Sequence, residues 1–179
     1  MMTRQYTLDL TNIDHEKIKT KIYKGKRNYK IFNCINEADI SEDDDTKQFR
    51  SIITDEDGTR IVCYSPPKTS SYEYFKQENN ISNESIIVNE LIEGTMITLF
   101  YDNELNCWEI ATKGAVGGNY WFFRTDYEKK SGQKTFRKMF LESLRASENE
   151  DLDSSPCISQ FSKEYCYTFI LQHPENHIV

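Results

Sequence analysis

The chain is poor in the residues and runs that define several protein classes. It contains 7 glycines and 4 prolines in 179 residues, too few for a collagen-like or low-complexity chain. It has no uninterrupted run of about 18 apolar residues, so no membrane-spanning helix is predicted. The N-terminal residues lead into no apolar segment of the kind found in secretory signals. We therefore expect a cytoplasmic protein with no membrane partner.

The cysteines and histidines are too few and too scattered to predict a disulfide framework or a metal site. The cysteines are Cys34, Cys63, Cys107, Cys157 and Cys166. Their number is odd and no two have the CxxC spacing, which favours free thiols in a reducing compartment. His173 and His177 are separated by Pro174, which breaks the helical geometry that would let both bind one metal.

Acidic residues outnumber basic ones, 29 to 22, and the formal net charge is −7. This balance argues against a generally basic, histone-like nucleic-acid binder. A basic segment near the N-terminus is either a solvated face or a surface that contacts RNA phosphates. It comprises Lys17, Lys19, Lys21, Lys24, Lys26 and Arg27. The acidic run at 42–45 lacks the glycine and the alternate spacing of a calcium loop, and we interpret it as a solvated connection.

Aromatic residues are abundant, with 11 tyrosines and 10 phenylalanines, and they indicate a folded core. β-Branched and alternating runs predict strands over residues 29–35, 49–54, 59–64, 85–92, 95–101, 107–112 and 165–171. The second and third of these flank an Asp-Gly turn and predict a hairpin. Thr69 or Ser70 is expected to cap a short helix. An apolar face at helical spacing predicts a second helix over residues 133–146.

Strands in hairpin-like succession with inserted helices indicate the α+β class with a mainly antiparallel sheet. The length fits a single domain over residues 1–179. The glycine-rich stretch at 113–119 lacks the spacings of a Walker loop and of a Rossmann turn. Neither a P-loop protein nor a dinucleotide-binding protein is therefore expected.

Four short motifs, in order along the chain, resemble the N-terminal adenylation domain of bacteriophage-type RNA ligases, a family of the covalent nucleotidyltransferase superfamily. They are Arg50-Ser51-Ile52-Ile53 with its hairpin and Pro66-Pro67-Lys68, Leu91-Ile92-Glu93-Gly94-Thr95, Ala111-Thr112-Lys113-Gly114-Ala115, and Tyr167-Thr168-Phe169-Ile170 with residues 174–179. The resemblance covers residues 49–179 and leaves 1–48 as a variable N-terminal segment. These sequence motifs are also similar to those of uncharacterised proteins from large DNA viruses. The scarcity of alanine is typical of an AT-rich coding genome.

The resemblance implies the fold shared by ligases and mRNA capping enzymes, with ATP and Mg²⁺ as cofactors and RNA as a partner. In that family a lysine amine attacks the α-phosphate of ATP, while other lysines, Mg²⁺ and carboxylates stabilise the charge. Carried over residue by residue, it implies nucleotide binding by Lys68, Glu90, Glu93, Gly94 and Lys113. For a viral protein it implies the host cytoplasm or a viral factory as the compartment.

Several departures separate this chain from an active ligase. Leu91 stands in the place of the nucleophilic lysine, and its side chain has no lone pair with which to form a phosphoramidate. Ser65 replaces an arginine before the first hairpin proline, and Ile170 replaces the glutamate of the third motif. The last two family motifs would lie beyond Val179, so the fold is expected to be truncated after the third motif.

Three interpretations stay open. The first is a degenerate RNA ligase-like domain that cannot self-adenylylate and retains nucleotide or RNA binding. The second is an active enzyme in which Lys113 or Lys68 substitutes as the nucleophile, or a partner chain supplies the missing motifs. The third is a protein-interaction module without nucleotide binding. The retained residues also have purely structural interpretations: Gly94 as a tight turn, and Glu93 and Lys113 as exposed side chains.

Overall fold

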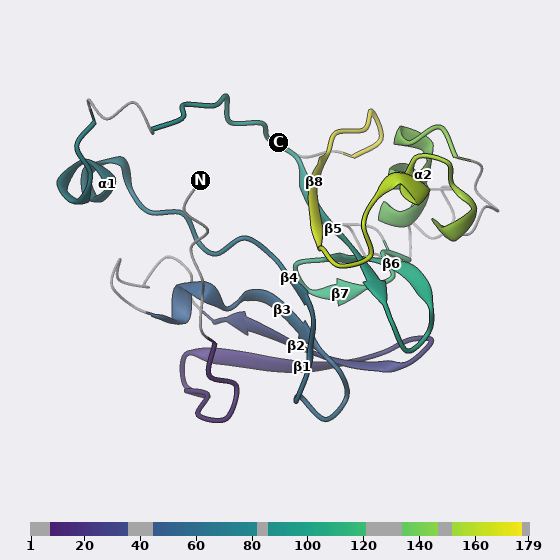
Figure 1. The fold of residues 1–179 in the computed structure, drawn as a ribbon, viewed down its shortest axis with the longest axis horizontal. Helices are drawn as coiled ribbons and strands as arrows, with labels where there is room; N and C mark the ends of the chain where they lie inside the picture. Colours follow the sequence, from purple (N-terminus) through teal and green to yellow (C-terminus); the bar gives the residue numbers. More distant parts are fainter. Residues whose placement is uncertain (1–7, 36–44, 82–85, 121–133, 147–151, 177–179) are drawn as a thin grey trace, which may run out of the picture.

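The structure is a computed structural model that describes residues 8–35, 45–81, 86–120, 134–146 and 152–176. It contains two antiparallel four-stranded sheets, here named sheet A and sheet B (Figure 1). Sheet A has the strand order β1-β2-β3-β4, with β1 (Ile18–Lys24), β2 (Asn28–Cys34), β3 (Arg50–Thr54) and β4 (Ile61–Tyr64). Sheet B has the order β7-β6-β5-β8, with β5 (Thr95–Asp102), β6 (Cys107–Thr112), β7 (Ala115–Val116) and β8 (Tyr167–Leu171). The prediction of an α+β chain with mainly antiparallel sheet is confirmed.

Two helices accompany the sheets among the described residues, α1 (Tyr72–Glu78) and α2 (Phe136–Ser143). Short 3₁₀ helices occur at Asp45–Gln48, Leu152–Ser154 and Ile158–Gln160. The predicted helix over 133–146 is confirmed for its central part, where Thr135 caps α2 by accepting a hydrogen bond from the backbone N–H of Lys138 at 3.2 Å. Neither α1 nor α2 has the length and apolar character that crossing a bilayer requires.

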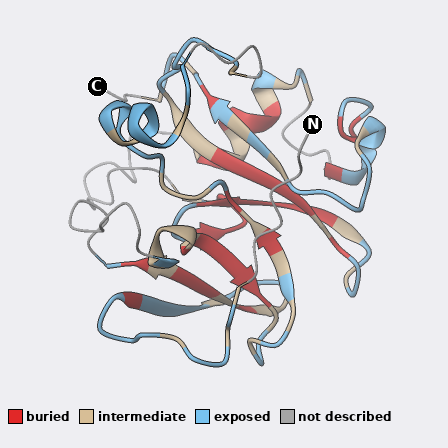
Figure 2. Ribbon diagram, turned by 60° about the vertical axis from the view of Figure 1, so that its left-hand side comes forward, coloured by how far each residue is buried: buried red, intermediate tan, exposed pale blue. Residues whose placement is uncertain are grey.

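Alternating side chains bury three apolar clusters in successive layers. The cluster between the sheets contains Tyr29, Ile31, Ile53 and Cys63 of sheet A and Phe100, Ala111 and Val116 of sheet B. The outer face of sheet B packs against α2 and the last two 3₁₀ helices. The outer face of sheet A is covered by Leu8, Leu10 and Ile13 from the N-terminal segment. The two sheets therefore form the centre of the molecule, which Figure 2 shows as buried.

The predicted hairpin around the Asp-Gly turn is confirmed by the pairing of β3 with β4. Asp55 holds the turn, because its Oδ1 accepts hydrogen bonds from the backbone N–H groups of Thr59 at 2.8 Å and Arg60 at 3.2 Å. Gly58 adopts the left-handed conformation that the turn needs, with φ of +80°. Ser51 also has a positive φ, +67°, at the point where the register between β2 and β3 shifts. Ser51 is thus the extra residue of a β-bulge.

The prediction of a strand over residues 85–92 is wrong for its described part, which is irregular from residue 86 onward. Val88 and Leu91 are each 90% exposed, and Ile87 is 72% exposed. β-Branched residues form a strand only where a neighbouring strand accepts their backbone hydrogen bonds. The helix cap was also misplaced: Ser71, not Thr69 or Ser70, accepts the capping hydrogen bond from the N–H of Tyr74 at 3.2 Å.

The basic segment contains a strand that the sequence did not predict. β1 pairs with β2 over its whole length, and Gly25 lies in the turn between them. The N-terminal part of the chain therefore supplies two of the four strands of sheet A. The glycine-rich stretch at 113–119 is likewise not a simple loop, because it includes β7, and Lys113-Gly114 is a two-residue hairpin turn between β6 and β7.

Candidate functional site at one end of sheet B

Three of the four ligase-like motifs meet at one end of sheet B. β5 is antiparallel to both of its neighbours, with Thr98 opposite Ala111 of β6 and Thr95 opposite Leu171 of β8. The start of β5 therefore lies beside the end of β6 and the end of β8. This register places three segments at the same end of the sheet, which we call the motif end of sheet B: Glu93-Gly94-Thr95, the Lys113-Gly114 turn and residues 172–176.

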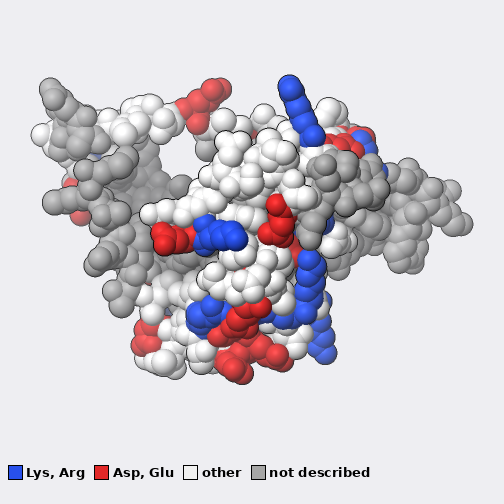
Figure 3. All heavy atoms as spheres, turned by 45° about the vertical axis from the view of Figure 1, so that its right-hand side comes forward, with Lys and Arg blue, Asp and Glu red and all other residues white. Residues whose placement is uncertain are grey.

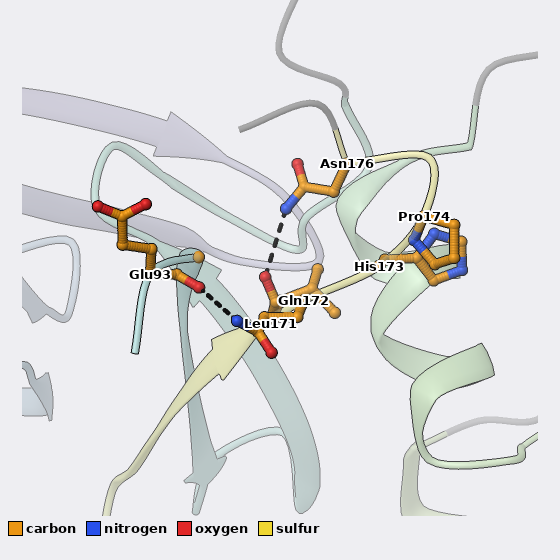
Figure 4. A pocket seen from close by; sticks show the side chains of 7 residues that line it. Glu93, Leu171, Gln172, His173, Pro174 and Asn176 are labelled. Carbon is orange, nitrogen blue, oxygen red and sulfur yellow. Dashed lines mark hydrogen bonds between the residues drawn. The ribbon is translucent and has the colours of Figure 1, made fainter. Parts of the chain in front are cut away.

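A pocket of about 420 Å³ opens at the motif end. Its described lining consists of Glu93, Gly94, Leu171, Gln172, His173, Pro174 and Asn176 (Figure 4). The amide of Gln172 donates to the carbonyl oxygen of Glu93 at 2.9 Å. The amide of Asn176 donates to Thr95 Oγ1 at 3.0 Å and lies 3.4 Å from the carbonyl oxygen of Leu171. These bonds hold the segment after β8 against the segment before β5.

Gly94 is required by the close approach of two backbones. A Cβ atom at this position would lie 2.5 Å from Ile170 Cγ2 and 2.7 Å from the carbonyl oxygen of Leu171. The second contact is with backbone and cannot be relieved by rotating a side chain. The glycine of the second motif therefore has a packing reason at this position. Gly114 differs, because a Cβ there would meet no atom within 4 Å.

An ionic network fixes the pocket wall to α2. His173 Nε2 lies 3.0 Å from Glu142 Oε2, and Lys134 Nζ contacts Glu142 at 2.8 Å and Glu175 at 2.7 Å. The backbone N–H of Glu175 donates to His173 Nδ1 at 3.1 Å, so the imidazole carries its proton on Nε2 and donates it to Glu142. The hydrogen bond from Lys134 lowers the pKa of Glu142, and the two carboxylates raise the pKa of Lys134.

The pocket offers hydrogen-bonding groups but little positive charge. Its described lining provides one carboxylate, two amides and an imidazole, and none of these lining residues is a lysine or an arginine. Such groups suit a neutral polar ligand, for example a base or a ribose, better than a triphosphate. In Figure 4 the carboxylate of Glu93 lies on the side opposite His173 and Pro174.

The structure places only some of the predicted nucleotide-binding residues together. Glu93 and Gly94 line the pocket, whereas Glu90 and Lys113 are exposed and are not among its described lining residues. Lys68 follows β4 of sheet A, and its backbone N–H donates to the carbonyl oxygen of Lys47 at 3.0 Å. Leu91 is also absent from that lining. The sheet register places Lys113 at the motif end together with Glu93.

The predicted RNA-binding cations divide into two groups. Lys17, Lys19, Lys21, Lys24 and Lys26 are exposed on β1 and beside it. Lys21 Nζ donates to the carbonyl oxygen of Gly114 at 3.3 Å, which brings β1 next to the motif end. Arg27 is instead bound to Asp102 and Glu104. On the face drawn in Figure 3, basic and acidic side chains are interleaved.

The sequence did not predict Asp102, which is completely buried at the opposite end of β5. Its carboxylate accepts hydrogen bonds from Tyr29 OH at 2.8 Å and from the backbone N–H of Glu104 at 2.9 Å, and it pairs with Arg27 Nε at 3.3 Å. Burial, with Asp102 as the second cause, raises the pKa of Tyr29. The only sequence signal was an acid that ends an apolar run. Gln172, His173 and Asn176 were also missed as pocket residues, although polar residues that follow a strand were a usable signal.

Comparison of the chain with models of protein families, with curated proteins and with solved structures finds no match. The resemblance to RNA ligases therefore rests on the sequence motifs alone. Among the described residues, no group of three or more His, Cys, Asp or Glu side chains is arranged to hold a metal ion.

Proposed function

We propose that this chain is an RNA ligase-like nucleotidyltransferase domain that has lost the covalent step and retains binding of nucleotide or RNA at the motif end of sheet B. One observation carries the proposal. Two motifs of the resemblance line one pocket and a third lies at the same end of sheet B, while the residue at the nucleophile position is Leu91, which is 90% exposed.

The missing step follows from side-chain chemistry. Transfer of AMP to a ligase requires an amine with a free lone pair, and enzymes provide it by lowering the pKa of a lysine. Leu91 has no such group, and Ile170 supplies no carboxylate beside Gly94. Without a carrier atom at this position, the nucleotide has nothing to which it can be joined.

The residual ligand is the neutral part of a nucleotide. The amides of Gln172 and Asn176, with the carboxylate of Glu93, can pair with a base or with ribose hydroxyl groups. A resident Mg²⁺ does not fit, because the described pocket lining provides Glu93 as its one carboxylate. We therefore expect ATP and adenosine to bind with similar affinity.

Labelling tests the loss of catalysis. Incubation with [α-³²P]ATP or GTP, in Mg²⁺ or Mn²⁺, is expected to leave the full chain without acid-stable label. The matched variant Lys113→Ala separates the alternatives. Label that appears on the wild type and disappears in this variant would contradict the proposal and identify an active enzyme with Lys113 as nucleophile.

Fluorescence titration tests the retained binding to RNA. A short RNA at low salt is expected to bind, and its affinity should fall steeply as salt rises, because lysines that contact phosphates release counterions. The charge reversal Lys19→Glu with Lys24→Glu and Lys26→Glu should abolish binding. Lys76→Glu, on the distant helix α1, is the control and should leave binding unchanged. Equal loss in both variants would count against a specific role for β1.

A second candidate function, a protein-interaction module, is favoured by the segment over residues 66–93. None of its described residues is buried, and Figure 2 shows α1 as exposed. Its exposed apolar side chains are Tyr72, Phe75, Ile81, Ile87, Val88, Leu91 and Ile92. Absence of ATP, GTP and RNA binding at low salt, together with self-association that Val88→Ser and Leu91→Ser remove in sedimentation experiments, would favour this function.

A further inference from the structure

A second pocket, of about 220 Å³, lies where the two sheets meet at their edges. It is lined by β4 and the residue before it (60–64), by Tyr101 and Asn103 at the end of β5, and by residues 163–166, which precede β8. β4 is the last strand of sheet A and β8 is the last strand of sheet B. Residues far apart in the sequence therefore face one another across the sheet interface.

Two cysteines meet in this second pocket. Cys63 is in β4 and is 1% exposed, whereas Cys166 is exposed and immediately precedes β8. Cys166 Sγ lies 3.8 Å from the carbonyl oxygen of Val62, the residue before Cys63. Both cysteines belong to the lining of this second pocket. Both are free thiols in this structure.

The surroundings give the two thiols opposite character. The hydrogen bond from Cys63 lowers the pKa of Cys166 to about 7. Burial raises the pKa of Cys63 well above its ordinary value. At neutral pH, Cys166 therefore carries more than about tenfold more thiolate than an ordinary cysteine thiol, whose pKa is about 8.5. An accessible thiolate beside a buried thiol is the arrangement of an attacking and a resolving cysteine.

We propose that Cys63 and Cys166 are a peroxide-reactive pair that forms a disulfide between β4, the edge strand of sheet A, and the residue that precedes β8, the edge strand of sheet B. The other cysteines do not offer this combination. Cys157 is exposed, but the carbonyl oxygen that its thiol contacts at 3.7 Å belongs to Leu144, which has no cysteine beside it in the sequence. Cys34 is buried, and its thiol contacts the carbonyl oxygen of Thr46 at 2.6 Å.

The reaction balances with hydrogen peroxide as the oxidant. The Cys166 thiolate attacks one peroxide oxygen, the O–O bond breaks, and the departing hydroxide takes a proton to become water. Cys63 sulfur then attacks the Cys166 sulfenic acid, the S–O bond breaks, and the Cys63 proton leaves with that hydroxyl as a second water. The two thiols lose two electrons, and peroxide is reduced to two molecules of water.

The test exposes the reduced full chain to hydrogen peroxide and measures free thiols and disulfide-linked peptides by mass spectrometry. The wild type should lose two of its 5 thiols and give one linked pair that contains Cys63 and Cys166. Cys157→Ser is the control and should give the same pair. Cys166→Ser should give no linked pair. In Cys63→Ala, the Cys166 sulfenic acid should persist and be trapped by dimedone.

The alkylation rate of Cys166 provides a readout independent of the disulfide. In the wild type it should rise with pH with a midpoint near 7, and in Cys63→Ala that midpoint should move upward. A dominant disulfide between other cysteines, sulfinic acid at Cys166 without a disulfide, or an unchanged midpoint in Cys63→Ala would overturn the proposal.

Discussion

The two ends of β5 contain different kinds of polar structure. At the Asp102 end, the carboxylate is fully buried and satisfied by Tyr29, by Arg27 and by backbone N–H groups. At the motif end, Glu93 is exposed, and the neutral amides of Gln172 and Asn176 join the segment after β8 to the start of β5. One strand thus joins a closed ionic cluster to an open pocket.

This difference teaches that burial and charge alone do not locate a ligand site. A buried carboxylate paired with an arginine is a frequent sign of a functional site, but structural ion pairs give the same sign. At Asp102, the strong hydrogen bonds of the carboxylate are made within the protein. At the motif end, the pocket opens to solvent and is lined by residues from two separate motifs, Glu93 and Gly94 from one and Pro174 and Asn176 from the other. We therefore assign a structural role to the Asp102 end and ligand binding to the motif end.

The largest expected effect comes from removing the buried carboxylate of Asp102. Asp102→Ala removes the acceptor of Tyr29 OH and of two backbone N–H groups and the buried partner of Arg27, and should lower the free energy of unfolding by about 3 kcal/mol. Urea denaturation measures this change. Glu104→Gln is the control, because Glu104 is 59% exposed and its ion pairs should contribute less than about 1 kcal/mol. An equal loss of unfolding free energy in the two variants would contradict the expectation that the buried carboxylate contributes more to stability than the exposed one.

The next effect compares the two motif glycines. Gly94→Ala inserts a Cβ 2.7 Å from a backbone oxygen, and should lower the free energy of unfolding by about 1–3 kcal/mol. Gly114→Ala meets no atom within 4 Å and has no positive φ, so it should change stability by less than about 0.5 kcal/mol. Both values can be measured by urea denaturation. A Gly114→Ala cost equal to that of Gly94→Ala would contradict the packing explanation.

A smaller effect concerns the ionic network behind the pocket, and it depends on pH. The folded-state pKa of Glu142 is lowered, first by the Lys134 hydrogen bond and then by His173. Its stabilisation is therefore complete above the ordinary pKa of 4.5 and is lost as pH falls through the lowered folded-state pKa. Glu142→Gln should melt below the wild type at pH 7, and this difference should vanish in acid.

The same thermal melts need a control for the loss of one acidic residue. Glu73→Gln, on the exposed helix α1, removes the same charge far from the pocket. It should melt with the wild type across the pH range. A pH-independent difference between Glu142→Gln and the wild type would show that packing, not the ion pair, holds the pocket wall.

The smallest effect tests the bulge that faces the motif end. Ser51 has a φ of +67°, a conformation that costs a non-glycine residue about 1–2 kcal/mol. Its hydroxyl lies 3.5 Å from the carbonyl oxygen of Thr112, a weak contact. Ser51→Gly relieves the backbone strain but increases the conformational entropy of the unfolded chain. The free energy of unfolding is therefore expected to rise by about 0.5 kcal/mol. Calorimetry that finds destabilisation would show that the hydroxyl contact outweighs the strain.

Local signals predicted much of the fold. The β3–β4 hairpin followed from its Asp-Gly turn, and β5 and β6 followed from apolar β-branched runs. β1 was missed because lysines at alternate positions hid the spacing of Ile18 and Ile22. The strand prediction for residues 86–92 was wrong for the opposite reason. Their composition favours a strand, but strand formation depends on a partner strand that the local sequence does not reveal.

Only those pocket residues that lie within a recognised sequence motif were predicted. Glu93 and Gly94 were found through the second motif. Gln172 and Asn176 were not, because they reach the pocket through the pairing of β5 with β8, and Gln172 contacts Glu93 across 79 residues of sequence. Lys68 illustrates the converse: a motif resemblance does not by itself bring a side chain to the pocket.

The most direct test of the assignment is an NMR titration of the ¹⁵N-labelled full chain with adenosine and then ATP. The account predicts that amide shifts concentrate at residues 93–96 and 171–176, and that signals at Arg27, Tyr29 and Asp102 stay in place. Shifts that cluster around Asp102, or the absence of any shift at saturating ligand, would contradict it.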